Sequence, residues 1–319
     1  MTQTMPDVDL WDDAPAEPDF GVKNGRYRYP APPGWTGRTP KPSPTNPLGT
    51  PSWMRTSNLA GAFSDQRALQ LWLERMTLRG LLANEGLLFD ELAAVPDSNL
   101  TDERLEEFAA LARTAAGADM GARKGTARHA VLEHYLDTGE IGGHRRMQLQ
   151  MADLLAEMDR QEVDFIPGWS ERVVWNSIAG GTMGRLDARV MCRRTGQEGV
   201  FDLKTQMRFW TYQEAAGQQA CYDGAEWVWE GPPSKEGFWR PYNLEGPANS
   251  LIGRKGGWCE GKRVALLAHM PRDGGPVQII EVDVEYGREV LATAARNVEL
   301  RSRGKSVAPG RAIAGIRPA

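Results

Sequence analysis

The chain has 319 residues, of which 41% are hydrophobic and 25% are charged, as is typical of a globular protein with one large or two modest domains. Its apolar runs are far shorter than the roughly 20 residues needed to cross a bilayer. The N-terminus also lacks the basic and apolar regions of a secretory signal. These features exclude a membrane-spanning protein and predict a cytoplasmic one.

The three cysteines are widely spaced and include no Cys-x-x-Cys pair. An odd number of cysteines at this spacing predicts neither a disulfide framework nor a four-cysteine zinc or iron–sulfur site. We therefore expect reduced cysteines and no iron–sulfur cluster.

The net charge of −4 is unevenly distributed along the chain. Residues 1–20 contain six acidic side chains and no Lys or Arg, so the remaining 299 residues carry a net charge of +2. Residues 296–319 contain six basic side chains and a single Glu. A near-neutral body with a basic tail is compatible with a polyanionic partner such as DNA, because only the field near the binding site matters.

Residues 1–51 contain 11 of the 21 prolines. Because proline has no backbone N–H for helix interiors or β-ladders, we expect residues 1–54 to form an extended or disordered arm. The acidic segment around Trp11 is either a solvated tail or a docking peptide. As a docking peptide, it would bind a recombination protein or a single-strand-binding or annealing protein.

Ordered structure is expected from about residue 55, in the α/β class. Apolar residues at helical spacing predict helices over 64–82, 101–115, 122–137 and 145–162. Alternating and β-branched residues then predict an antiparallel meander of strands over 171–178, 184–192 and 200–205. These are followed by a helix over 211–228, a Gly- and Pro-rich loop over 231–262, a hairpin of strands 264–270 and 277–284, and a helix over 286–303.

The expected domains follow from these elements and from the composition. They are the arm (1–54), an N-terminal helical region (55–120), an α/β core (121–303) with a loop insertion (231–262), and a flexible basic tail (304–319).

Two carboxylates and an ammonium group are predicted to converge on one face of the meander. Asp202 and Lys204 lie two residues apart on one strand, so they share a face, while Leu203 points to the opposite layer. Asp187 on the neighbouring strand reaches the same place. Alone, this pattern is typical of a solvated ion pair on an exposed sheet face. Burying such charges among apolar strands costs free energy, however, so their presence here favours a functional site. Both carboxylates are hard ligands suited to Mg²⁺ or Mn²⁺.

Two helical pairs add weaker signals. His129 and Glu133 are four residues apart and share one helix face, as do Gln218 and Tyr222. A single helical histidine is more often a packed core residue than a ligand, and Gln218 with Tyr222 describes no more than one polar edge. His134 lies five residues after His129, about 140° around the helix, which excludes a zinc-protease arrangement.

Together, these residues resemble the PD-(D/E)XK nuclease superfamily. The motifs follow one another as Gly125-Thr126 with His129 and Glu133, Gly184 with Asp187, Asp202 with Lys204, and Gln218 with Tyr222. The most similar branch is the RecB-type nuclease domain, including phage-type exonucleases. The likeness runs from about Gly121 to Tyr222 and more loosely to about Arg296. It implies a restriction-endonuclease-like core, in which helices flank a central mixed sheet with an antiparallel meander.

The resemblance implies a metal-dependent deoxyribonuclease, more in keeping with an exonuclease on linear DNA ends in phage-type recombination or replication than with an endonuclease. One or two Mg²⁺ or Mn²⁺ ions would be held by His129, Asp187, Asp202 and the Leu203 carbonyl, with Lys204 beside them as a catalytic residue. The first acidic position of the family is either Glu133 or Glu171. Residues that would contact DNA are Gln218 and Tyr222 by resemblance, and Arg185 and Arg208 by their nearness to the motifs.

Two alternatives remain open. A structure-specific endonuclease would share every active residue and differ in how it grips DNA ends. A non-catalytic DNA-binding protein would keep the fold alone, although a site without catalysis has no physical need for clustered charge.

Overall fold

The computed structural model describes residues 26–41, 43, 49–62, 67–83, 86–118, 120–206, 212–231, 237–242 and 264–306. The acidic segment around Trp11, Arg208, most of the predicted insertion and most of the basic tail lie outside these residues. Within the described residues, no helix is long and apolar enough to cross a membrane.

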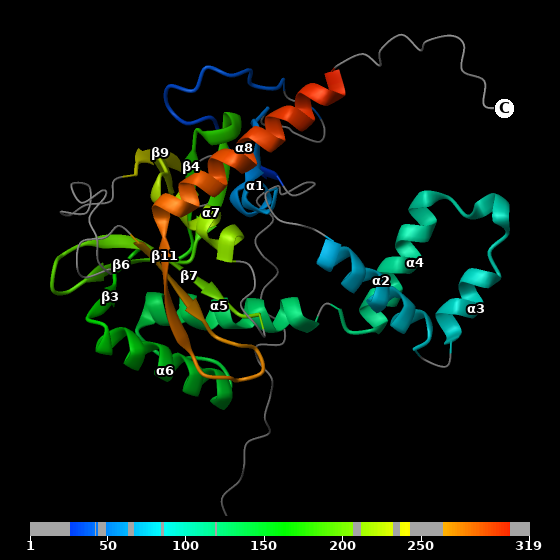
Figure 1. The fold of residues 1–319 in the computed structure, drawn as a ribbon, viewed down its shortest axis with the longest axis horizontal. Helices are drawn as coiled ribbons and strands as arrows, with labels where there is room; N and C mark the ends of the chain where they lie inside the picture. The colour runs from blue at the N-terminus through cyan, green and yellow to red at the C-terminus, as the bar shows by residue number, and fades with distance from the viewer. Residues whose placement is uncertain are drawn as a thin grey trace, which may run out of the picture.

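The fold is α/β, with two mixed sheets among the described residues (Figure 1). The six-stranded sheet has the order β1 (Arg26–Arg28), β2 (Ser52–Arg55), β5 (Thr182–Leu186), β4 (Arg172–Asn176), β8 (Trp227–Glu230) and β9 (Phe238–Pro241). The five-stranded sheet has the order β11 (Gln278–Asp283), β10 (Val264–His269), β7 (Glu198–Lys204), β6 (Ala188–Cys192) and β3 (Val163–Phe165). Parallel pairing joins β2 to β5 and β7 to β10.

The strand expected over 184–192 is in fact two strands that belong to different sheets. Strand β5 pairs with β4 in the six-stranded sheet, whereas β6 pairs with β7 in the five-stranded sheet. Asp187 is the single residue between them. The predicted meander is therefore antiparallel in its pairings but divided between two sheets, and Asp187 lies where the chain crosses from one to the other.

Helices cover both faces of the five-stranded sheet (Figure 1). On one face, α5 (Met120–Thr138) and α6 (Arg145–Arg160) bury apolar side chains such as Val131 and Leu154 against Phe201 and Leu203. On the other face, Ala216 of α7 (Tyr212–Asp223) packs in a cluster with strand residues of β7 and β10. The last helix, α8 (Val284–Ser306), packs on α7 and on the short α1 (Thr56–Gly61). The alternation along β7 thus sends successive side chains to opposite layers, as its sequence predicts.

The expectation that the first 51 residues form no ladder is wrong, because Arg26–Arg28 pairs antiparallel with Ser52–Arg55. Proline is absent from both strands, and each contributes an aromatic residue, Tyr27 in β1 and Trp53 in β2. Tyr29 and Trp53 are almost fully buried, and the Trp53 indole donates a hydrogen bond to the Tyr29 carbonyl at 3.0 Å. Aromatic contacts of this kind bury large areas and fix part of the predicted arm to the body.

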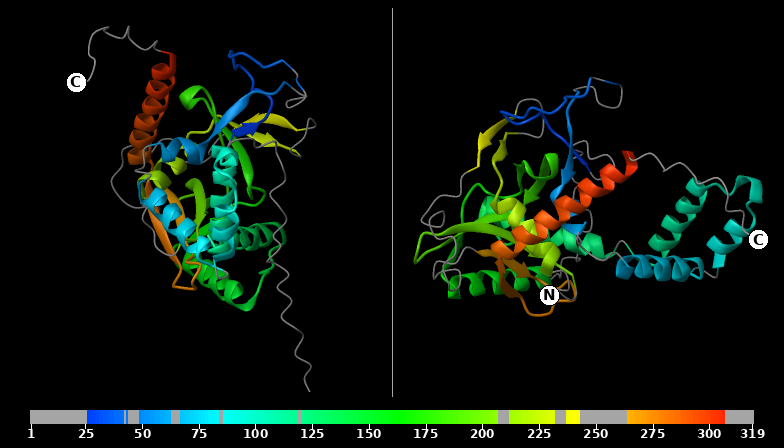
Figure 2. Two further views of the ribbon diagram at one scale, coloured as in Figure 1. Left: turned by 90° about the vertical axis from the view of Figure 1, so that its right-hand side faces the viewer. Right: turned by 45° about the horizontal axis from the view of Figure 1, so that its top comes forward.

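The helices α2 (Arg67–Leu81), α3 (Leu87–Ala93) and α4 (Asp102–Ala115), with the short 3₁₀ helix η2 (Asp97–Asn99), form a unit to one side of the body, which we call the helical unit (Figures 1 and 2). Met76, Phe108 and Ala112 are buried within it. Many of its large hydrophobic side chains are more than a third exposed: Leu69, Leu71, Trp72, Leu78, Leu82, Leu87, Phe89, Leu105 and Leu111.

Three further predictions differ from the structure. The helix expected over 211–228 ends at Asp223, and Trp227–Glu230 is strand β8. The insertion expected to be a loop contains strand β9, which pairs with β8. Among the described cysteines, Cys221 is a buried free thiol, whereas Cys192 is disulfide-bonded, so the expectation of reduced cysteines is wrong at Cys192.

Candidate active site

A cleft of about 450 Å³ lies where the two sheets meet. Its walls come from elements far apart in sequence, namely β1, β2, α1, α5, β5, β7 and α7. The predicted site residues that line it are His129, Glu171, Arg185, Asp187, Asp202, Lys204, Gln218 and Tyr222.

Asp187 is the central carboxylate of this cleft. Its Oδ2 atom accepts a hydrogen bond from the backbone N–H of Leu203 at 2.6 Å and lies 3.3 Å from Nδ1 of His129. The first contact ties the crossing point between the sheets to β7, and the second ties it to α5. Asp187 is therefore held in one orientation by two elements.

Glu171 joins the same group from the turn before β4. Its φ of 51° is in the left-handed region, which is unusual for a residue with a side chain and directs Glu171 out of the strand path. Its N–H donates to the Asp187 carbonyl at 3.2 Å, and its carboxylate forms an ion pair with Arg185. Ligand atoms of His129, Glu171 and Asp187 all lie within 4.8 Å of one another.

This geometry favours Glu171 over Glu133 as the further acidic residue of the site. Glu133 lies on the exposed side of α5 and lines a neighbouring pocket rather than the cleft. Its carboxylate is not part of the group formed by His129, Glu171 and Asp187.

A chain of polar contacts runs from Asp202 to Tyr222. Lys204 Nζ lies 2.7 Å from Asp202 Oδ2 and donates a hydrogen bond to Gln218 Oε1 at 3.0 Å. Gln218 Nε2 in turn donates to the Tyr222 hydroxyl at 3.0 Å. The side-chain amide of Gln218 is thereby oriented with its oxygen toward Lys204, so α7 positions the ammonium group on β7.

At two positions in the motifs, neighbouring elements approach so closely that only glycine fits. A Cβ atom at Gly184 would collide with the Tyr222 ring, and one at Gly125 would lie only 2.8 Å from Thr205 Oγ1. Gly184 therefore lets α7 approach β5, and Gly125 lets α5 approach the end of β7.

The histidine and the glutamate hold protons more strongly than usual. Burial lowers the pKa of His129, but the adjacent Asp187 carboxylate outweighs that effect and raises it to about 9. Burial together with the charge of Asp187 raises the pKa of Glu171 to about 8. Carboxylates this close repel one another, so a cation placed among them would favour their ionised forms.

Asp187 and Lys204 remain charged in this environment. Burial would raise the pKa of Asp187, but His129 and the Leu203 N–H hold it below its ordinary value. Burial would lower the pKa of Lys204, but the charge of Asp202 holds it above its ordinary value. Lys204 is therefore an ammonium group at neutral pH.

The donor set fits a divalent cation. One imidazole nitrogen and two carboxylates face a common point, with the Asp202 carboxylate in the same cleft, and hard oxygen donors with one histidine suit Mg²⁺ or Mn²⁺. The Leu203 side chain is buried in the layer beneath the cleft, as predicted. The role of its carbonyl as a ligand stays a prediction.

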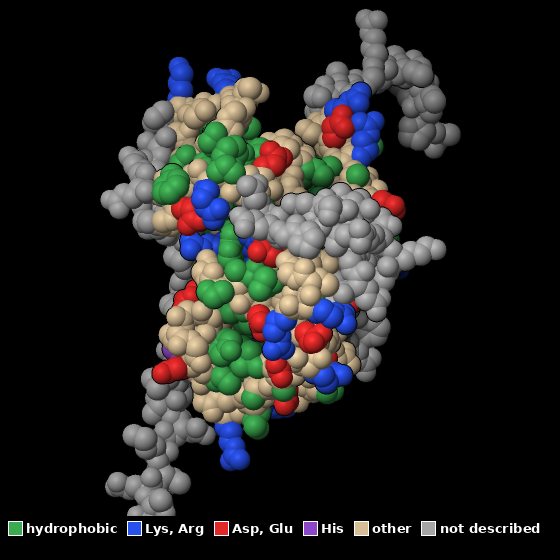
Figure 3. All heavy atoms as spheres, turned by 90° about the vertical axis from the view of Figure 1, so that its left-hand side faces the viewer, with side chains coloured by type: hydrophobic (Ala, Val, Ile, Leu, Met, Phe, Trp, Pro, Cys, Tyr) green, Lys and Arg blue, Asp and Glu red, His purple; other side chains and the backbone are tan. Residues whose placement is uncertain are grey.

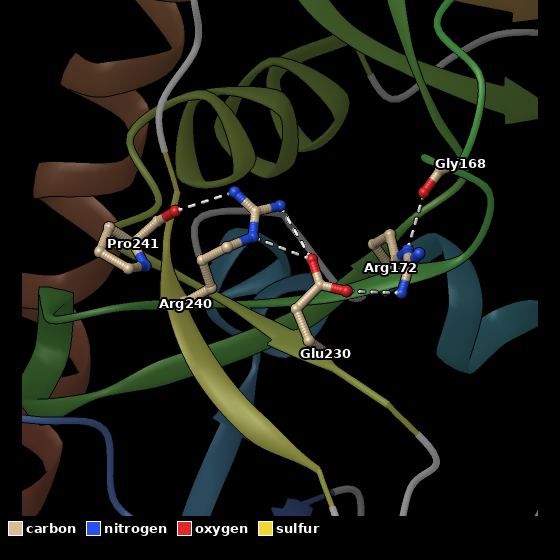
Figure 4. Close-up of polar contacts among 5 residues, drawn as sticks. All are labelled: Gly168, Arg172, Glu230, Arg240 and Pro241. Atoms are coloured by element: carbon tan, nitrogen blue, oxygen red, sulfur yellow. Dashed lines mark hydrogen bonds and ion pairs between the residues drawn. The ribbon is translucent and has the colours of Figure 1, made fainter.

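A bridging carboxylate next to the site secures the turn that carries Glu171 (Figure 4). Glu230 Oε2 accepts from Arg172 at 3.2 Å, and its Oε1 accepts from Arg240 at 2.8 Å. The Arg172 Nε also donates to the Gly168 carbonyl at 2.8 Å. Glu230 on β8 thus fixes the residue that follows Glu171 and, through it, the preceding turn.

The predicted residues divide into three groups. His129, Glu171, Asp187, Asp202, Lys204 and Gln218 lie together in the cleft. Tyr222 also lines the cleft, but it is only 3% exposed and its hydroxyl accepts a hydrogen bond from Gln218. Arg185 reaches the cleft but is paired with Glu171.

Sequence patterns did not identify several residues that line the cleft. These are Tyr27, Arg55, Thr56, Ser57 and Glu214. Most of them come from β1, β2 and α1, whose only local signal is a run of aromatic and polar residues in and after a Pro-rich segment.

No protein-family model matches the chain, and no curated protein is significantly similar to it.

Proposed function

We propose that the protein is a metal-dependent DNA nuclease that hydrolyses phosphodiester bonds in the cleft between its two sheets. The observation that carries this proposal is the group formed by His129, Glu171 and Asp187, whose ligand atoms lie within 4.8 Å of one another beside the Asp202–Lys204 pair. Carboxylates that could hold a cation, placed next to a lysine, suit a negatively charged substrate, because its charge would be neutralised by the cation on one side and by the ammonium group on the other.

The metal site would consist of His129, Glu171, Asp187 and Asp202. A bound Mg²⁺ or Mn²⁺ ion supplies an activated water and neutralises charge on the phosphate. Asp187 is suited to its part because the Leu203 N–H and His129 already orient its carboxylate. Glu171 and His129 must release their protons before they can ligate a cation.

Lys204 would act as a hydrogen-bond donor to the phosphate or to the leaving oxygen. Its raised pKa keeps the ammonium protonated, which suits a donor better than a general base. Asp202 and Gln218 hold Nζ in place from two directions, so little side-chain entropy remains to be lost when substrate binds. Tyr222 supports Gln218 and is a positioning residue.

Linear DNA ends are the substrate that the resemblance favours, in phage-type recombination or replication. A structure-specific endonuclease would use the same residues. A non-catalytic DNA-binding protein is disfavoured by the arrangement of Lys204, which is held by two partners inside the cleft.

The test is digestion of end-labelled linear DNA beside closed circular DNA, with Mg²⁺, with Mn²⁺ and with EDTA. We expect metal-dependent loss of the linear substrate alone, which Lys204→Ala and Asp202→Asn abolish. Cleavage of the circle would reassign the protein as an endonuclease with the same site. If neither substrate is cut, or if both variants cut as fast as the parent, the nuclease proposal is wrong.

A further inference from the structure

Three basic residues lie on segments that adjoin one end of the cleft, and we call Lys124, Arg146 and Arg272 the basic rim. They come from three separate places: the first turns of α5, the first turn of α6, and the turn between β10 and β11. Lys124 and Arg146 are exposed and Arg272 is half-buried.

The buried Arg128 holds these three places together. Its guanidinium donates to the Lys124 carbonyl at 2.9 Å, to the Arg272 carbonyl at 3.0 Å and to Gln150 Oε1 at 3.2 Å. Gln150 in turn donates to the Pro271 carbonyl at 2.9 Å. Because every one of these partners is a neutral oxygen, Arg128 brings the backbones together without neutralising the charge of the rim.

The Arg146 side chain lies over the turn that carries Arg272. The guanidinium of Arg146 lies directly over Gly274, where any side chain would displace it. Burial lowers the pKa of Arg128, and the positive charges of Arg146 and Arg272 lower it further, although Asp273 opposes them. The rim is therefore a concentration of like charge with one acidic neighbour.

This concentration is not offset by ion pairs. Within the described part of the chain, no acidic side chain lies within ion-pair distance of Lys124, Arg146 or Arg272. At the opposite end of α6, by contrast, Arg160 pairs with Glu157 and Arg193 pairs with Asp159. Figure 3 shows a face where basic and acidic side chains lie next to one another in the same way.

The position of Arg146 is also unfavourable for the protein itself. It lies in the first turn of α6, which holds two arginines and no acidic residue. Positive charge at a helix N-terminus opposes the helix dipole and is destabilising. Because this positive charge is unfavourable for the helix, its presence points to a function for the charge.

The rim adjoins the reactive end of the cleft. The Arg272 N–H donates to the Thr205 carbonyl at 3.1 Å, and Thr205 follows Lys204 and lines the cleft. Gly125 follows Lys124 and also lines the cleft, in close approach to Thr205. A strand whose phosphate lies beside Lys204 and that leaves the cleft at this end therefore passes the rim.

We propose that Lys124, Arg146 and Arg272 bind the sugar–phosphate backbone of DNA just outside the cleft and so set the path of the strand that enters it. This inference rests on the proposed nuclease function and adds the route of the substrate. Contacts of this kind read no sequence, because the phosphates are the same at every step. They contribute affinity that falls with salt as bound counterions are released.

The experiment is equilibrium binding of fluorescently labelled linear duplex DNA and of the matching single strand, in EDTA so that no metal-dependent hydrolysis occurs, over a series of salt concentrations. The test variant is Arg146→Ala with Arg272→Ala. The matched control is Arg160→Ala with Arg193→Ala, which removes the same charge near the far end of α6, where Arg160 lies about 21 Å along the helix axis from Arg146. Thermal unfolding of each variant verifies that it is folded.

We expect the rim variant to bind more weakly than the parent and to reduce the salt slope by about 1 for each cation removed, while the control binds as the parent does. Replacement of both rim arginines by lysine should restore most of the affinity, because the charge is kept. If the parent cuts and binds DNA but the rim variant binds with the same affinity and slope, this inference is wrong and the proposed function stands. If the parent neither binds nor cuts DNA, the proposed function itself fails, and the inference fails with it.

Discussion

Two regions of the molecule differ in which side chains they bury. One is the body, which carries the cleft, and the other is the helical unit of α2, α3 and α4. In the body, charged groups such as Asp187 and Asp202 are buried and large hydrophobic residues are covered from both faces of the five-stranded sheet. In the helical unit, large hydrophobic residues such as Leu78 and Leu82 are exposed.

This difference shows which side chains indicate function and which contribute to stability. Buried charge costs free energy, so its concentration in the body marks the place where the protein uses charge. Exposed apolar side chains add little to the stability of the helical unit, because their area stays in contact with water. The two regions should therefore respond differently to equivalent substitutions.

The largest expected effect is on catalysis. Lys204→Ala should lower the rate of DNA hydrolysis by about 10²–10⁴-fold, because it removes a donor that Asp202 and Gln218 hold in the cleft. Arg104→Ala removes a cation from the exposed surface of α4 and should leave the rate unchanged. Equal rates for the parent and Lys204→Ala in a labelled-DNA assay would remove the functional distinction between the regions.

The next effect is on the free energy of unfolding. Met151→Ala should reduce it by about 2–5 kcal/mol, because Met151 is fully buried between α6 and the five-stranded sheet. Leu78→Ala, at a site that is 62% exposed, should change it by no more than about 0.5 kcal/mol. Denaturant unfolding followed by circular dichroism measures both. A larger loss for Leu78→Ala than for Met151→Ala would show that the helical unit is covered in solution.

A smaller effect is expected beside the cleft. Glu230→Gln keeps the shape of the bridge to Arg172 and Arg240 but removes its charge, so the turn that carries Glu171 should be less well held. We expect Mn²⁺ affinity, measured by titration calorimetry, to fall by about ten-fold, as for other supporting residues of metal sites. Glu299→Gln, which alters an exposed ion pair on α8, is the control. Unchanged Mn²⁺ affinity in Glu230→Gln would show that Glu230 does not position Glu171.

The last effect concerns pH. The pKa of His129 is about 9 in the folded protein against 6.5 ordinarily, and that of Glu171 is about 8 against 4.5. The folded state therefore binds protons more tightly than the unfolded state, and the stability that this contributes is lost as pH rises through these ranges. Without metal, the Tm should fall between about pH 4.5 and about pH 9, and Mn²⁺ should raise it most at the higher pH.

A matched variant isolates this contribution. Glu171→Gln removes one of the two groups and should flatten the decline of Tm with pH. If Glu171→Gln and the parent lose the same Tm over this range, Glu171 does not contribute to it.

Sequence reasoning found the elements whose evidence is local. The helix expected over 101–115 is α4, and the hairpin expected near 264–284 is formed by β10 and β11, because periodicity and turn residues determine such elements within a short window. The shared face of Asp202 and Lys204 was also predictable, since strand geometry alone determines it.

Non-local features could not be predicted in this way. The residues next to Asp187 on either side are apolar. One long strand and two strands in different sheets would both show this pattern, so the sequence does not distinguish them. The parallel pairing of β7 with β10 joins segments about 60 residues apart. The choice between Glu133 and Glu171 depended on a positive φ at Glu171, which its side chain does not favour.

The most direct test of the account measures Mn²⁺ binding and DNA hydrolysis on the same samples of the parent and of Asp187→Asn. Asp187 contacts both His129 and the backbone of Leu203, so its carboxylate is central to the proposed metal site. We predict that the parent binds Mn²⁺ and cuts linear DNA only with the metal, and that Asp187→Asn loses both properties together. Hydrolysis that persists in EDTA, or an Asp187→Asn protein that binds Mn²⁺ and cuts DNA as the parent does, would contradict it.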